Sequence, residues 1–341
     1  MSRSIRLATA AAAALAAFAF TGSAWAVYSP RLIVVPISNA PGKPTTVVLG
    51  HSQELNDDAT VKDTVYAPLG YQVNLTQAIG LKIGDADATL VLRNLGNTQV
   101  DVTGEVTVDN PAAHPSDQCA PGLHQAVWKL NLTIAGTPLP TVFLYVDAVT
   151  AGPEATFASA KIQFCLLGPV GTPNGAQLLF ALFDVNGVFT NPPNTSDRIW
   201  RGVFTPYFPG TSTPNPAGTT EGQALVPGRI SFKLAVKSLR HGRIILSGRL
   251  LADGQPIPRA QVDIYVGTRR VARVRTNASG RFTVRKRIKR KTRYQAIVTF
   301  VAELAQCPAP PLPPTSVPQG CKSATIGFTA ISNRVTARRR R

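Results

Sequence analysis

Regular alternation of apolar and polar side chains limits the fold of this 341-residue sequence more than any other feature. The segments Val100–Val108 and Ala126–Ile134 carry apolar residues at nearly every second position, with Asp, Thr, Glu, Lys or Asn between them. A period of two places one face of a β-strand in a core and the other in water. The sequence therefore predicts half-buried strands.

Turn signals separate these segments from further short apolar runs. The 27 glycines and 28 prolines lie largely between the runs, often as Asn-Gly or Pro-Gly pairs such as Asn186-Gly187. No amphipathic helix is expected after the N-terminal segment, so the predicted fold class is all-β with antiparallel sandwiches, immunoglobulin-like or jelly-roll-like. The other candidate strands are Arg31–Ile37, Thr46–Leu49, Ala88–Leu92, Thr141–Val146, Lys161–Cys165, Gln177–Phe183 and Ile199–Phe204.

The first 26 residues resemble an export signal. Arg3 and Arg6 precede an apolar stretch from Leu7 to Phe20, and Ala24-Trp25-Ala26 provides the small residues that signal peptidase accepts. The apolar stretch is shorter than the roughly 20 residues that span a bilayer. We therefore expect cleavage after Ala26, a secreted or extracellular mature chain without a transmembrane span, and attachment to the cell wall as an alternative to free release.

Four cysteines are consistent with an oxidising compartment. Cys119 and Cys165 lie in one region and Cys307 and Cys321 in another, so we expect the disulfides Cys119–Cys165 and Cys307–Cys321. The spacing fits none of the common zinc motifs. Six prolines between Cys307 and Cys321 predict a stiff loop closed at its base by the second disulfide.

Charge divides the mature chain in two. Residues 27–225 carry nine Lys and Arg against 15 Asp and Glu, a net charge of −6. Residues 226–341 carry 25 Lys and Arg against three acids, a net charge of +22. Such asymmetry predicts an acidic domain at 27–226, a basic domain at 227–337 and a basic tail at 338–341. The Pro- and Gly-rich stretch Pro209–Gly222 would be a linker or a long hairpin loop.

The basic part contains a recognisable pattern of turn and core residues between Ile244 and Phe300. Its elements are Gly248-Arg-Leu250, the run from Gly254 through Pro256 to Ile264, the run from Thr276 through Gly280 and Phe282 to Val284, and Tyr294. This segment resembles the carboxypeptidase regulatory-like (transthyretin- or immunoglobulin-like) β-sandwich domains of secreted bacterial proteins. The preceding acidic part resembles uncharacterised exported proteins of actinobacteria.

The resemblance implies architecture more than activity, because such domains act as spacers or adhesion modules and carry no catalytic residues. It implies that Ala260, Val262 and Ile264 face the core and that Gly280 closes a turn before the core residue Phe282. This sequence departs from the family at Asn277, where an acid is usual, and at 291–293, where Lys-Thr-Arg replaces a Pro-Gly turn.

Candidates for chemistry are sparse. No nucleophile elbow, phosphate-binding loop or dinucleotide-binding turn occurs in the sequence, so we expect no enzyme, cofactor or resident metal. Asp85 and Asp87 share a strand face and would contact a Ca²⁺ ion, but a calcium loop needs six or more oxygens. His114, Cys119 and His124 lie close in sequence, within an irregular Pro-rich loop. Solvated turn and loop residues are the favoured interpretation of both groups.

Clustered cations are the one unusual feature, and they predict an anion-binding surface. Like charges on adjacent strands repel, so a nearby anion would stabilise them, although Arg richness for solubility is the competing interpretation. Residues 285–293 are expected at a hairpin tip, near cations of the preceding strand and the Arg338–Arg341 tail. The candidate residues are Arg269, Arg270, Arg273, Arg275, Arg285, Lys286, Arg287, Lys289, Arg290, Lys291 and Arg293.

The sequence thus predicts an exported, non-catalytic envelope protein whose basic domain binds an anionic cell-envelope polymer or lipid headgroups. Few aromatic residues lie among the cations, so base stacking and specific nucleic-acid recognition are not expected. The alternative is a carbohydrate-binding or adhesion module in the acidic region, in which aromatic side chains stack on sugars. The candidates for stacking are Trp128, which alternates with Leu130 and so is expected in the core, together with Trp200, Tyr145 and Tyr207.

Overall fold

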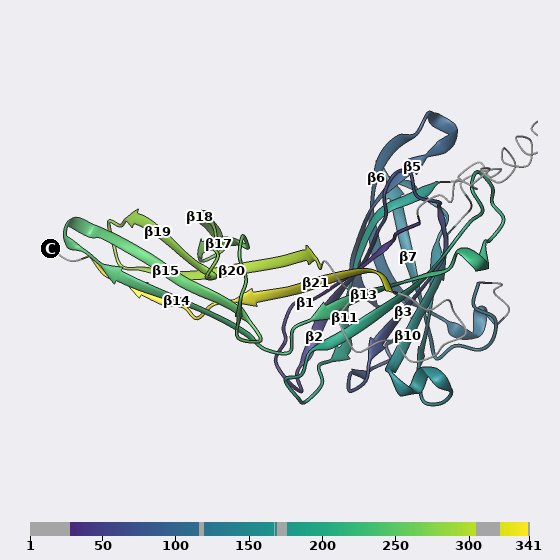
Figure 1. The fold of residues 1–341 in the computed structure, drawn as a ribbon, viewed down its shortest axis with the longest axis horizontal. Helices are drawn as coiled ribbons and strands as arrows, with labels where there is room; N and C mark the ends of the chain where they lie inside the picture. The colour runs from purple at the N-terminus through teal and green to yellow at the C-terminus, as the bar shows by residue number, and fades with distance from the viewer. Residues whose placement is uncertain (1–27, 116–118, 167, 169–175, 305–320, 340–341) are drawn as a thin grey trace, which may run out of the picture.

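A computed structural model describes residues 28–115, 119–166, 168, 176–304 and 321–339. These residues form an all-β protein with two sheets and a few single-turn 3₁₀ segments, so the all-β part of the predicted fold class is confirmed. Within the described ranges, no helix has the length and apolar character needed to cross a bilayer. The ribbon is elongated, with a larger β unit at one end and a narrower one at the other (Figure 1).

The larger unit is a run of eleven strands that curls around one core. Each of these strands contributes buried apolar residues to that core, which includes the fully buried Trp128 and Trp200. The short strands β4 (Gln72–Val73) and β8 (Thr137–Pro138) lie at its margins. In lateral order the eleven are β1 (Arg31–Pro36), β2 (Pro44–Ser52), β11 (Gln177–Thr190), β5 (Lys82–Leu92), β6 (Thr98–Asp109), β7 (Ala126–Ile134), β9 (Val142–Ala148), β10 (Ala158–Cys165), β3 (Thr60–Pro68), β12 (Arg198–Pro206) and β13 (Thr220–Val226).

The smaller unit encloses a second core between two layers of strands. Leu246 and Leu250 from one layer pack with Val262 and Phe328 from the other. The first layer contains β14 (Ile230–Ser238), β15 (Arg243–Ala252), the short β16 (Gln255–Pro256) and β19 (Arg281–Arg287). The second contains β17 (Gln261–Val266), β18 (Arg269–Arg275), β20 (Thr292–Glu303), β21 (Cys321–Ile331) and β22 (Val335–Ala337).

Strand β21 belongs to both units. Its first half pairs in parallel with β13, whereas the half that ends at Ile331 pairs antiparallel with β20. The hydroxyls of Ser323 and Thr325 donate to the backbone carbonyls of Pro30 and Leu32, at 2.7 and 2.6 Å, along the edge of β1. Figure 1 shows β21 passing from one unit into the other. The first and last strands of the large curl therefore meet where the small unit is attached.

Two of the three acidic residues of the segment 226–341 contact the large unit at this junction. Glu303 forms an ion pair with Arg31, which also binds Glu54 at 2.9 Å. Asp253 occupies the β15–β16 turn and hydrogen-bonds to the carboxyl group of Asp197, which precedes β12 in the large unit. Burial, together with the hydrogen bond and charge of Asp197, raises the pKa of Asp253 to about 6. Below that pH the protonated Asp253 therefore bonds favourably to Asp197, whereas at higher pH the two carboxylates repel each other.

Several local expectations need correction. The Asn186-Gly187 turn is wrong: both residues lie within β11, where the pairing with β2 shifts register and Gly187 has a φ of +70°. A bulge that uses a glycine in the left-handed region has the same sequence signature as a turn. Pro209–Gly222 is a hairpin loop that ends in β13, and not a linker, because β12 and β13 pair directly.

The disulfide between Cys119 and Cys165 is confirmed, with Cα atoms 5.7 Å apart. It ties the chain before β7 to the end of β10. The expected Cys307–Cys321 bond and the intervening Pro-rich loop lie outside the described residues.

Asp253→Asn should stabilise the protein above pH 7. A carboxyl group whose pKa is raised in the folded state contributes stability below its unfolded pKa, and loses it as pH rises through the folded value. Asn keeps the hydrogen bonds, tolerates the positive φ of 49° at this turn and cannot ionise. We expect a gain of up to about 1 kcal/mol at pH 8, given partial exposure, and almost none near pH 4.

Urea denaturation at the two pH values measures this difference. Asp101→Asn, an exposed carboxylate on β6, is the control for loss of one negative charge. Equal gains at both pH values, or a gain in the control as large, would show that the carboxyl pair is not the cause.

Candidate anion-binding face

The outer face of the β14–β15–β19 layer is covered by cations that pairing brings into rows. Lys233 lies opposite Arg249, which lies opposite Arg281 on the next strand, and Arg243 lies opposite Arg287. The inward neighbours are buried apolar residues, so alternation forces these side chains outward. We call this surface the basic face; its exposed cations are Lys233, Lys237, Arg243, Arg249, Arg281, Arg285 and Arg287.

Among the residues that the structure describes, no acid lies within ion-pair distance of the cations of the basic face. The segment 226–341 has three acidic residues, and all lie elsewhere. Glu303 pairs with Arg31 and Asp253 contacts Asp197, both at the junction between the units. Asp263 on β17, in the opposite layer, accepts hydrogen bonds from Arg273 at 2.7 and 3.1 Å and lies 3.7 Å from Arg270. The hydrogen bond from Arg273 lowers the pKa of Asp263, so this carboxylate stays ionised.

The eleven cations expected from the sequence divide into three places. Those of 269–275 lie on β18, in the opposite layer, where Arg270 and Arg273 already share Asp263. Arg285, Lys286 and Arg287 lie on β19, and the remaining four follow it. Strands β18 and β19 contact each other as the adjoining edges of the two layers. Among the described residues, the other nine cations have no acid within ion-pair distance.

The expected hairpin tip at 285–293 is wrong. Strand β19 pairs with β15, whereas β20 pairs with β17, β21 and β22, so the cationic segment connects the two layers. Ile288 is buried and its amide donates to the carbonyl of Gly242, which anchors the connection. Arg339 lies beside Gly242, so this C-terminal cation adjoins the same end.

Sequence reasoning missed five members of the basic face. These residues lie singly among apolar neighbours, whereas the candidates named from the sequence lie in dense runs of cations. The alternation itself was the available signal, because Lys233 and Lys237 occupy polar positions of a segment in which apolar residues recur at every second position. The register that aligns these residues is set by pairing and is not visible in the sequence. The five are Lys233, Lys237, Arg243, Arg249 and Arg281.

The other candidate chemical groups have ordinary partners. Asp85 binds Lys82 at 2.8 Å. His114 contacts Asp109, and His124 contacts Asp147 at 2.9 Å, while Cys119 is in the disulfide. Within the described part of the chain, no three His, Cys, Asp or Glu side chains converge as metal ligands would.

The aromatic residues proposed for sugar stacking are not available at the surface. Trp128 and Trp200 are fully buried, and Tyr145 and Tyr207 are 1% and 6% exposed. Trp200 packs edge-on against Tyr71 and Phe189 in the core of the large unit. A stacking platform needs an exposed ring face, so this candidate site is wrong.

No protein-family model matches the sequence, and no curated protein is similar to it. The likeness to carboxypeptidase regulatory-like domains therefore stays a prediction. The packing roles that it assigned are met: Gly280 has a φ of +70°, and the expected core residues Ala260, Val262, Ile264 and Phe282 are buried.

Arg249→Glu should stabilise the fold, because it places an anion between Lys233 and Arg281. Removing two unfavourable cross-strand pairs and creating two favourable ones should add about 1 kcal/mol at low salt. The gain should shrink at about 1 M salt, where screening acts over roughly 3 Å. Urea denaturation at both salt concentrations measures the effect.

Lys43→Glu makes the same charge change at an exposed position between β1 and β2, away from the basic face. It should have a much smaller effect. If both variants shifted stability equally, net charge rather than the cation row would account for the result.

Proposed function

We propose that this chain is an exported, non-catalytic protein that attaches to an anionic polymer of the cell envelope through its basic face. Its parts would be a signal peptide at 1–26, an acidic β-sandwich domain at 27–226 and a basic β-sandwich domain at 227–337. The observation that carries the proposal is the alignment of cations in rows with no acid among them.

The geometry suits a repeating polyanion. Adjacent strands are about 4.8 Å apart, so the row from Lys233 through Arg249 to Arg281 spans roughly 10 Å. Guanidinium groups bind phosphate and sulfate with paired hydrogen bonds, and most of the basic face is Arg. Successive anionic groups of one polymer would therefore meet several fixed partners at once. A single small anion would meet only one or two.

Protection of free strand edges is the competing explanation for surface cations. Edge strands often carry Lys or Arg, which prevent pairing with another chain. This accounts for the cations of β18 and β19, since each pairs on one side only. It does not account for Arg243 and Arg249 on β15, because β15 is paired on both sides. Cations on the central strand favour a bound anion.

Neutralising the centre of the basic face should weaken polyanion binding selectively. For the full-length mature chain, Arg249→Gln with Arg281→Gln should elute from heparin resin at clearly lower salt. The slope of log affinity against log salt should fall by about one per lost contact, here about two.

Lys43→Gln with Arg229→Gln is the control of equal charge, because both cations are exposed and off the face. This variant should elute close to the unmodified protein. Identical elution of the two double variants would mean that attraction depends on net charge alone, and the basic face would not be a site.

The export assignment predicts a mature chain that begins at Val27. Intact mass and N-terminal sequencing of the protein recovered outside the cytoplasm would establish the first residue. Replacing Ala24 and Ala26 by larger residues should block processing, because signal peptidase requires small side chains there. Recovery of an extracellular chain that retains residues 1–26 would contradict the assignment.

A further inference from the structure

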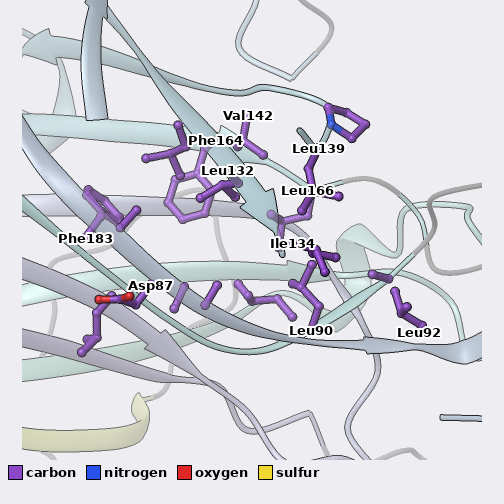
Figure 2. Close-up of a pocket in the computed structure, with 18 of the residues that line it drawn as sticks. Asp87, Leu90, Leu92, Leu132, Ile134, Leu139, Val142, Phe164, Leu166 and Phe183 are labelled. Atoms are coloured by element: carbon purple, nitrogen blue, oxygen red, sulfur yellow. The ribbon is translucent and has the colours of Figure 1, made fainter. Parts of the chain in front are cut away.

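An apolar cavity of about 330 Å³ lies in the large unit, far along the chain from the basic face. Its walls come from β5, β7, β9, β10 and β11 and from the loops that adjoin them. Figure 2 shows the labelled side chains Leu132, Leu139, Val142 and Phe164 around the hollow. This volume is within the range of about 300–1,000 Å³ found for small-molecule sites.

Exposure along the cavity shows which end is open. The inner wall contains Leu130, Phe164 and Phe183, which are all buried. At the other end Leu92 is partly exposed and Leu95, in the β5–β6 connection, is 65% exposed. The ends of β5, β7 and β10 and the starts of β9 and β11 meet there, so the cavity opens where connections leave the curled sheet.

The lining is almost entirely aliphatic. Asp87 is the one described lining residue with a charged side chain, and it is exposed and alternates with the buried Ala86 and Ala88. Alanines at 86, 88 and 181 leave space that larger residues on the same strands would fill. Protein cores rarely leave apolar space of this size unfilled, because packing contacts are lost.

We propose that this cavity binds one acyl chain of a lipid, with the methyl end inside and the headgroup in water beside Leu95. An apolar cavity of about 150 Å³ holds a benzene molecule, so this one accommodates about ten to twelve carbons. A sugar or a peptide would bury hydroxyl or amide groups without partners here, which is costly. A flexible aliphatic chain has no polar group to leave without a partner, and it conforms to the irregular wall.

Uncharged ligands distinguish binding in the cavity from binding at the basic face. Calorimetric titration of the full-length mature chain with monoacylglycerols of about six to about sixteen carbons reads the cavity alone, because the glycerol head carries no charge. Affinity should rise with chain length and level off near about ten to twelve carbons, where the cavity is full. Burial of an alkyl chain gives a heat that changes with temperature, so absence of heat at every chain length and at two temperatures would overturn the proposal.

Two cavity variants and a control locate the binding. Ala88→Phe should fill the hollow and weaken decanoylglycerol binding by at least about tenfold, whereas Ala235→Phe, on the exposed face of β14, should leave it unchanged. Leu132→Ala enlarges the cavity and should move the chain length at which affinity levels off to longer chains, a readout that remains if Ala88→Phe does not fold. Binding that ignored both cavity variants would place the ligand elsewhere and refute the site. The cavity proposal does not depend on the basic face, so a failure of the protein to bind heparin would not change the interpretation of the monoacylglycerol titrations.

Discussion

Strand β21 is the element on which the arrangement of both units depends. It extends the large curled sheet by pairing with β13 and continues into the small unit by pairing with β20. Side-chain hydroxyls at Ser323 and Thr325 also satisfy carbonyls on the edge of β1. Backbone hydrogen bonds are directional, so one strand shared by the two units fixes the position of one unit against the other more firmly than a flexible linker would.

This attachment determines where the scarce acids of the basic segment are used. Glu303 at the end of β20 meets Arg31, and Asp253 in the β15–β16 turn meets Asp197. The third acid, Asp263, neutralises cations of β18. The outer face of the other layer is left with seven cations and no acid, although like charges across strands oppose folding. We infer that a bound anion offsets this electrostatic repulsion.

Much of the fold could be predicted from the sequence, because alternation reports burial directly. β6 and β7 were located this way, and the disulfide Cys119–Cys165 followed from spacing. Pairing partners could not be predicted, since any two alternating strands look compatible locally. The row through Arg249 arises from non-local register, and the buried contact of His51 with Asp63, at 3.0 Å, joins strands β2 and β3, which do not pair with each other. The apolar cavity was missed for the same reason.

Hydrogen–deuterium exchange of the full-length mature chain, with and without saturating heparin, tests the central claim most directly. A polyanion held across the cation rows should slow amide exchange in β14, β15 and β19, because it removes the repulsion that favours local opening. Protection should be greatest at low salt and absent from β5 and β11. Protection confined to β18 and the C-terminal arginines, with β15 unchanged, would contradict the account.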